Sequence, residues 1–111
     1  MYATGHLSSY MNYGSGNYSF NLMAAHQLNG SSPVLNTITC VSVYCGTSTC
    51  NAHNEIAICL DPTDPSHVHF SYWIGTDGDV EHLYLYKPGN GFNMSQQYHT
   101  YGFNWVMNNT L

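Results

Sequence analysis

Residues 54–59 read Asn54-Glu55-Ile56-Ala57-Ile58-Cys59, a short run rich in residues that favour extended structure. We expect it to form a β-strand, in which successive side chains point to opposite faces of the sheet. Glu55, Ala57 and Cys59 then lie on one face of that strand. The run therefore predicts a sheet with one face that carries a carboxylate, a methyl group and a thiol in a row.

Similar β-rich runs, separated by turn residues, continue through the rest of the chain. Pro62 and Pro65 interrupt any ladder after the central run, because proline has no backbone N–H to donate. No segment keeps a helical apolar period for about three turns. The pattern predicts an all-β fold, an antiparallel β-sandwich. Its expected strands are residues 5–11, 16–25, 36–44, 54–60, 67–74, 80–86 and 98–106.

Several segments resemble family 16 of the glycoside hydrolases, which includes lichenases, laminarinases and xyloglucan transglycosylases. Residues 54–59 resemble the catalytic strand Asp-Glu-Ile-Asp-Ile-Glu, and residues 98–105 (YHTYGFNW) resemble Phe-His-Thr-Tyr-Gly-Phe-Asp-Trp. Residues 5–9 (GHLSS), 13–18 (YGSGNY) and 68–73 (VHFSYW) resemble further family segments, in the same order. The resemblance implies a concanavalin-like jelly roll.

The same resemblance assigns roles to the central strand. It implies that Glu55 occupies the position of the catalytic nucleophile, Ala57 that of the intervening aspartate, and Cys59 that of the general acid/base. A retaining glycosidase needs two carboxyl groups about 5–5.5 Å apart. Cysteine replaces such an acid poorly, because a thiol is a weak hydrogen-bond donor with a pKa of about 8.5. We therefore expect a vestigial site rather than an efficient retaining β-glycosidase.

Charged residues make up only 6% of the chain, with formal net charge −5 and one Lys or Arg in total. Ordinary soluble proteins carry about 25%. The chain has too few positive charges to attract a phosphate backbone, so we exclude nucleic acid as a partner. No apolar run approaches the roughly 20 residues that cross a bilayer, and no signal peptide is evident, so we expect a mature fragment and no membrane insertion.

The chain contains four cysteines. An even number in a chain that looks extracellular favours two disulfides, and three connectivities are possible. If the strands on either side of residues 46–53 pair antiparallel, residues whose numbers sum to about 98 or 99 lie opposite each other. Cys40 then faces Cys59, and Cys45 and Cys50 close the loop between the strands. Zinc is the competing explanation, but the spacing lacks paired zinc ligands, so we expect no metal site.

His67 and His69 form a His-x-His pair on one face of a strand. Such a pair can bind metal, but without a third ligand we interpret these residues as ordinary polar positions of the strand.

Asn-x-Ser/Thr sequons are further signs of a secreted protein, in which N-linked glycans would supply the solubility that charges do not. Asn29 and Asn93 are the stronger candidates, since both lie beside Gly-rich turns. N-linked glycans are the only non-protein groups that we expect. The sequons stand at Asn17, Asn29, Asn93 and Asn108.

Three residues are candidates for carbohydrate binding. Trp73 and Ser71 correspond, by the resemblance, to substrate-contacting positions, and Tyr44 shares the same expected face. An aromatic ring offers a flat apolar surface on which a pyranose ring can stack. We expect the neighbouring Phe70 and Tyr72 to turn into the core instead.

At 111 residues the chain corresponds to a single domain, residues 1–111. The matched segments cover only the middle of the family's sandwich, so we expect missing sequence or a neighbouring subunit to complete it.

Three functions remain open at this point. The first is a non-catalytic secreted glycoprotein that serves as a structural subunit of an extracellular or surface assembly, such as a filament or other homo-oligomer. The second is a carbohydrate-binding module for a β-glucan or related polysaccharide. The third is a weakly active hydrolase or transglycosylase with Asp61 as an unusual acid.

Overall fold

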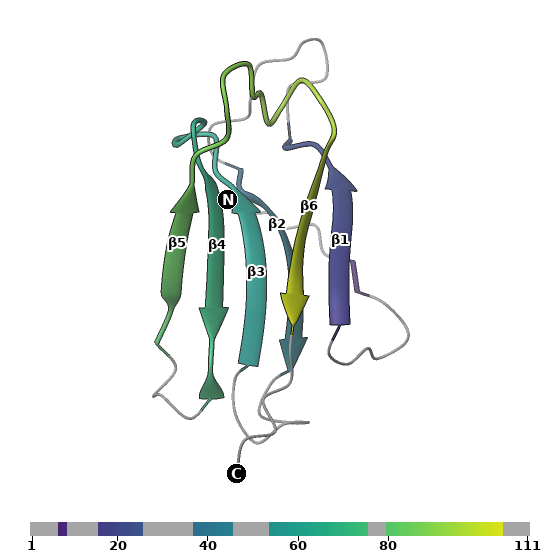
Figure 1. The fold of residues 1–111 in the computed structure, drawn as a ribbon, viewed down its shortest axis with the longest axis vertical. Coiled ribbons are helices and arrows are strands. Elements are labelled where there is room, and N and C mark those ends of the chain that lie inside the picture. Colours follow the sequence, from purple (N-terminus) through teal and green to yellow (C-terminus); the bar gives the residue numbers. More distant parts are fainter. Residues whose placement is uncertain (1–6, 9–15, 26–36, 46–53, 76–79, 106–111) are drawn as a thin grey trace.

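The computed structural model describes residues 7–8, 16–25, 37–45, 54–75 and 80–105. These residues form six strands and no α-helix, so the all-β prediction is confirmed (Figure 1). The strands are β1 (Gly16–Leu22), β2 (Thr39–Cys45), β3 (Asn54–Leu60), β4 (Val68–Trp73), β5 (His82–Tyr86) and β6 (His99–Trp105).

Two antiparallel sheets make up the described fold. One has four strands in the order β2-β3-β4-β5, and the other has two strands, β1 and β6. In Figure 1 the β1–β6 pair lies on the opposite side of the molecule from β5, with β6 drawn in front of β2. The arrangement is that of a β-sandwich whose sheets are not closed.

The strand predictions agree with the structure apart from their ends. β1 ends at Leu22, earlier than the predicted residue 25, because the backbone N–H of Ala24 donates to the carbonyl of Met94 at 2.7 Å instead of continuing the ladder with β6. The first predicted strand, 5–11, lies outside the described residues except for Leu7 and Ser8, which are not in a strand.

The core lies between the two sheets. Its buried members are Ala24, Ile58, Leu60, Val68, Met94 and Tyr101, with Leu22, Val41, Phe70, Phe92 and Phe103 packed against them. These residues come from every strand except β5 and from the segments that flank the strands. The described part of the second layer therefore covers one side of the four-stranded sheet but does not reach β5.

The prediction that Tyr72 turns into the core is wrong, because its side chain is not covered. Tyr72 has the same orientation as Phe70, which packs against the core, but Tyr72 is 45% exposed and stacks on His82 with ring centroids 4.6 Å apart. Alternation fixed its face correctly. It did not reveal that the described part of the second layer fails to reach this end of β4.

An open hollow follows from the same incomplete cover. It is lined by residues of β4, β5 and β6 and of the β5–β6 connection, among them Phe70, Tyr86, Phe92 and His99. Tyr101 also lines it, and its buried hydroxyl has no hydrogen-bond partner among the described residues. Burial raises the pKa of the Tyr101 hydroxyl above its ordinary value.

Gly102 allows β1 and β6 to approach closely. A Cβ atom at this position would lie 2.6 Å from the backbone carbonyl oxygen of Tyr18. We expect Gly102→Ala to lower the free energy of unfolding by about 1–3 kcal/mol, because the backbone of β1 must shift to relieve the clash. Chemical denaturation measures this loss. Gly89→Ala is the matched control, since a Cβ there meets no atom within 4 Å; equal stability of the two variants would contradict the prediction.

Candidate functional site

One row of paired residues crosses the four-stranded sheet on the face that points away from the β1–β6 layer. Tyr44 of β2 pairs with Glu55 of β3, and Glu55 pairs with Trp73 of β4. Directly paired residues of antiparallel strands have Cβ atoms about 4.5–5.5 Å apart and point to the same side. The row therefore places an aromatic ring on each side of one carboxylate. We call Tyr44, Glu55 and Trp73 the aromatic row.

The aromatic row is accessible from solvent. Tyr44 is 62% exposed, while Glu55 and Trp73 are partly buried. The next row along the sheet consists of the small residues Ser42, Ala57 and Ser71. Ala57 and Ser71 are buried, so only a small part of the Ser71 surface, which the sequence suggested as a sugar contact, can be reached from outside.

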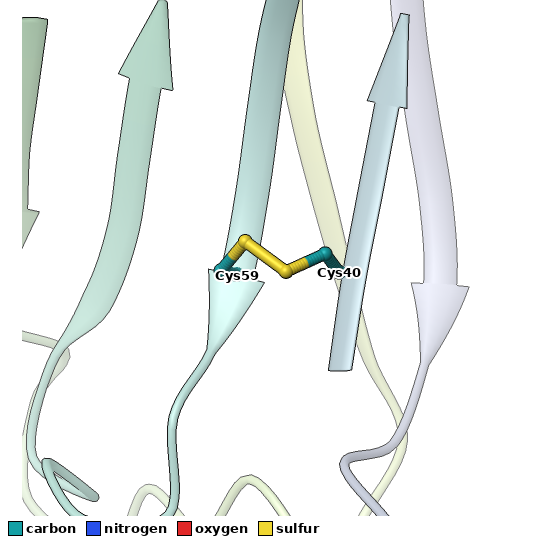
Figure 2. Close-up of a disulfide and its surroundings, with 2 residues drawn as sticks. All are labelled: Cys40 and Cys59. Carbon is teal, nitrogen blue, oxygen red and sulfur yellow. A yellow bond between two sulfur atoms is a disulfide. The ribbon is translucent and has the colours of Figure 1, made fainter. Parts of the chain in front are cut away.

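The third row contains a disulfide. Cys40 pairs with Cys59 in the register, and their sulfur atoms are bonded, as Figure 2 shows between β2 and β3. The prediction of this register and of this bond is confirmed. Cys45 is also disulfide-bonded, but Cys50, its predicted partner, lies outside the described residues.

This disulfide has a chemical consequence at the position that the sequence pattern assigned to the general acid/base. A sulfur atom in a disulfide carries no proton, so Cys59 has none to donate to a leaving group. Glu55 is the only carboxylate in the described strands of the four-stranded sheet. A retaining mechanism requires a second carboxyl group close to the first, and these strands do not supply one.

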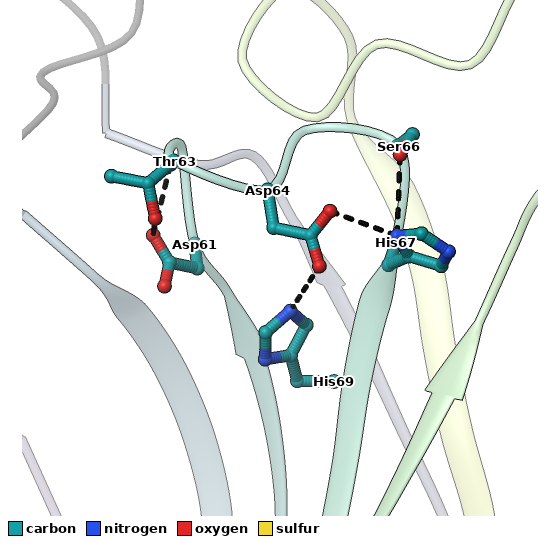
Figure 3. Close-up of polar contacts among 6 residues, drawn as sticks. All are labelled: Asp61, Thr63, Asp64, Ser66, His67 and His69. Carbon is teal, nitrogen blue, oxygen red and sulfur yellow. Dashed lines mark hydrogen bonds and ion pairs between the residues drawn. The ribbon is translucent and has the colours of Figure 1, made fainter.

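Asp61, the alternative acid, lies in the turn that follows β3 (Figure 3). Its Oδ1 accepts hydrogen bonds from the Thr63 hydroxyl at 2.7 Å and from the Thr63 backbone N–H at 2.9 Å. These bonds, the hydroxyl contributing most, hold the pKa of Asp61 below its ordinary value. The group is therefore ionised at neutral pH, which does not suit a proton donor.

The depressed pKa of Asp61 predicts a loss of stability in acid. A carboxylate whose pKa is lower in the folded state stabilises the fold above its unfolded-state pKa, and this contribution disappears as the pH falls through the folded-state value. We expect the Tm of the wild type to fall more steeply below about pH 4 than that of Asp61→Asn, which keeps an acceptor oxygen but does not titrate. Thr63→Ala, which keeps only the backbone donor, should be intermediate. Superimposable pH profiles would contradict this account.

A second polar cluster joins the same turn to β4 (Figure 3). The Asp64 carboxylate lies 2.8 Å from Nδ1 of His67 and 2.9 Å from Nε2 of His69, and the Ser66 hydroxyl lies 3.2 Å from the same His67 nitrogen. The hydrogen bonds from His67 and then His69 lower the pKa of Asp64. The sequence singled out the two histidines but missed Asp64, although its place three residues before His67 in a Pro-rich turn was a signal.

Metal binding by this cluster is not supported. Each carboxylate oxygen of Asp64 is engaged by one histidine ring, and within the described ranges no group of three or more His, Cys, Asp or Glu residues could hold a metal ion.

Among the described residues, no helix is long and apolar enough to cross a membrane.

The predicted glycosylation sites fall in different places. Asn17 is exposed on β1. Asn93 lies in the connection between β5 and β6, where its Oδ1 accepts from the backbone N–H groups of Ser95 and Gln96, both at 3.0 Å. Asn29 and Asn108 lie outside the described residues.

Comparison with known proteins gives one informative similarity. The chain is 40% identical over 65 residues to a xylanase/beta-glucanase from Ruminococcus flavefaciens. The match covers 59% of this chain but only 8% of that protein, so the chain spans a small part of the length of its relative. No family model matches the sequence. The similarity indicates a relationship to glycoside hydrolases.

Proposed function

We propose that this chain is a non-catalytic relative of the family 16 glycosidases that binds β-glucan or a related β-linked polysaccharide on the exposed face of its four-stranded sheet. One contrast carries this proposal. The aromatic row keeps an accessible pair of rings around a carboxylate, whereas the position of the general acid/base is an oxidised cysteine. Binding groups remain, and the proton donor for cleavage is missing.

The chemistry of the aromatic row suits a sugar chain. The ring faces of Tyr44 and Trp73 offer apolar surface for the C–H face of a pyranose, and the Glu55 carboxylate between them can accept hydrogen bonds from sugar hydroxyls. The site is a sheet face rather than a deep pocket, since the hollow lined by Phe70, Tyr86 and Phe92 lies on the other side of the sheet. An extended polysaccharide fits such a surface better than a small molecule does.

Affinity electrophoresis against a panel of polysaccharides tests this proposal. We expect retardation by mixed-linkage β-glucan or xylan and none by amylose, whose α-linked chain presents its rings in a helical rather than an extended form. The polysaccharides should be recovered without new reducing ends. Retardation by none of the β-linked chains, or release of reducing ends, would overturn the proposal.

Secretion and glycosylation belong to the same proposal. The Cys40–Cys59 disulfide requires an oxidising environment to form and persist, which supports an extracellular location. Asn17 is an exposed acceptor for an N-linked glycan. The intact mass of natively sourced protein should fall after enzymatic removal of N-glycans, whereas an unchanged mass would contradict glycosylation.

A second candidate function is that of a structural subunit in an extracellular assembly. The observation that favours it is the uncovered end of the four-stranded sheet, where β5 exposes large apolar side chains. Exposed strand edges are sites for pairing with another chain. This candidate and glycan binding are compatible, because they use different parts of the sheet.

A further inference from the structure

β5 is the least protected element of the described fold. It is the last strand of the four-stranded sheet, visible at the far left in Figure 1, and no described strand pairs with its outer side. All of its residues except His82 are exposed: Leu83 54%, Tyr84 65%, Leu85 45% and Tyr86 49%. Proteins usually protect such an edge with an inward-pointing charge, a proline or a bulge. Within β5 the sequence has no charged residue and no proline.

Two copies of the segment around β5, aligned antiparallel, bring compatible residues opposite each other. Residues 81–87 read Glu-His-Leu-Tyr-Leu-Tyr-Lys. An antiparallel pair of two such strands, centred on Tyr84, places residues whose numbers sum to 168 opposite each other. Leu83 then faces Leu85 of the second copy, and Tyr84 faces Tyr84. We propose that β5 pairs in this register with β5 of a second copy of the chain, which joins the two sheets into one.

The side chains of β5 suit this register on both faces of the sheet. Leu83 and Leu85 lie on the face of the aromatic row, since they pair with Ser71 and His69 of β4. On this face the contact forms leucine pairs across the two-fold axis. On the other face Tyr84 meets its own copy and His82 meets Tyr86. His82 already stacks on Tyr72 inside the chain, so an aromatic ladder continues across the contact.

The charges identify the partner as another copy of this chain. Lys87 is the only Lys or Arg in the sequence, and it follows β5 directly. In the proposed register it lies opposite Glu81 of the second copy, so each contact holds two opposite-charge pairs. A shift of two residues in the register would separate them. A parallel arrangement would place each charge beside its like, which is unfavourable.

This contact deepens the assembly candidate and, through it, affects the proposed glycan binding. A two-fold axis between paired antiparallel strands is perpendicular to the sheet, so both aromatic rows face the same side. Such a dimer could hold one polysaccharide at two places, which raises the apparent affinity. This consequence rests on the proposed function, whereas the contact itself does not and is tested in the absence of sugar.

Sedimentation velocity over a range of protein concentrations tests the contact. We expect a reversible dimer that Tyr84→Lys weakens at least about tenfold, because the two new charges lie directly opposite at the centre. Tyr98→Lys is the matched control, since Tyr98 is 67% exposed and lies outside β5, and it should dimerise like the wild type. Circular dichroism verifies that both variants keep their strands. A wild type that remains monomeric at every concentration, or a dimer that Tyr84→Lys leaves intact, would overturn the proposal.

Charge reversal tests the register itself. Glu81→Lys and Lys87→Glu each place like charges opposite one another, so each variant alone should dimerise more weakly than the wild type. Mixed together, the two variants restore both opposite-charge pairs and should form a heterodimer preferentially. Absence of that preference would overturn the register. A larger oligomer that persists in Tyr84→Lys would reject β5 as the contact while leaving the assembly candidate standing, and sugar binding by a monomer would leave the proposed function standing.

Discussion

The double substitution Cys40→Ser and Cys59→Ser will lower the free energy of unfolding by about 3 kcal/mol. The two cysteines are 19 residues apart in the sequence, and the bond between them restricts the unfolded chain over that loop. Their strands pair along their whole length, from Thr39 opposite Leu60 to Cys45 opposite Asn54, so we expect the variant still to fold. Neither side chain is fully buried, which lets a serine hydroxyl reach solvent.

Guanidinium denaturation of the double variant and the wild type measures this loss. Ser42→Ala is a suitable control, because Ser42 is exposed on the same face of β2 between the two disulfide-bonded cysteines of that strand. It should change the midpoint little. A double variant as stable as the wild type would mean that the bond contributes no constraint to the fold.

Trp73→Ala will weaken binding to β-glucan about tenfold or more, which is the loss expected when a central aromatic contact is truncated. The reason is the position of Trp73 in the aromatic row, where its ring and that of Tyr44 flank Glu55. Removal of the ring takes away one of the two stacking surfaces. Calorimetric titration with an oligosaccharide of β-linked glucose measures the change.

The control for this prediction is Tyr98→Ala, which removes an aromatic ring that is 67% exposed, and so more accessible than Trp73, from a different part of the molecule. It should bind like the wild type. Equal losses in both variants would indicate a general effect on folding, and no loss in Trp73→Ala would remove Trp73 from the binding site.

The sequence predicted most of the sheet because the relevant signals are local. Alternation along 54–60 identified which residues share a face, and the short connection between two runs set the register that brings Cys40 to Cys59. The same register, together with the resemblance to family 16, predicted that Tyr44 and Trp73 share a face with Glu55, and the structure adds that they lie on its two sides. These relations depend on strand geometry alone, so a single sequence contains them.

What the sequence did not predict depends on contacts between distant parts of the chain. Tyr72 has the orientation of a core residue, but its cover depends on how far the second layer extends, and β5 receives none from the described residues. Asp64 reaches His69 across the end of β4 only because the turn at Pro62 and Pro65 folds back over the sheet. Neither contact can be predicted from the alternation of residues along a single strand.

Calorimetric titration of the wild-type protein with a β-linked gluco-oligosaccharide, followed by sizing of the recovered sugar, tests the central claim most directly. The aromatic row and the oxidised Cys59 together predict saturable binding and an oligosaccharide of unchanged length. Shortened products would contradict the loss of catalysis. The absence of saturable binding to any β-linked oligosaccharide would contradict the retained sugar site.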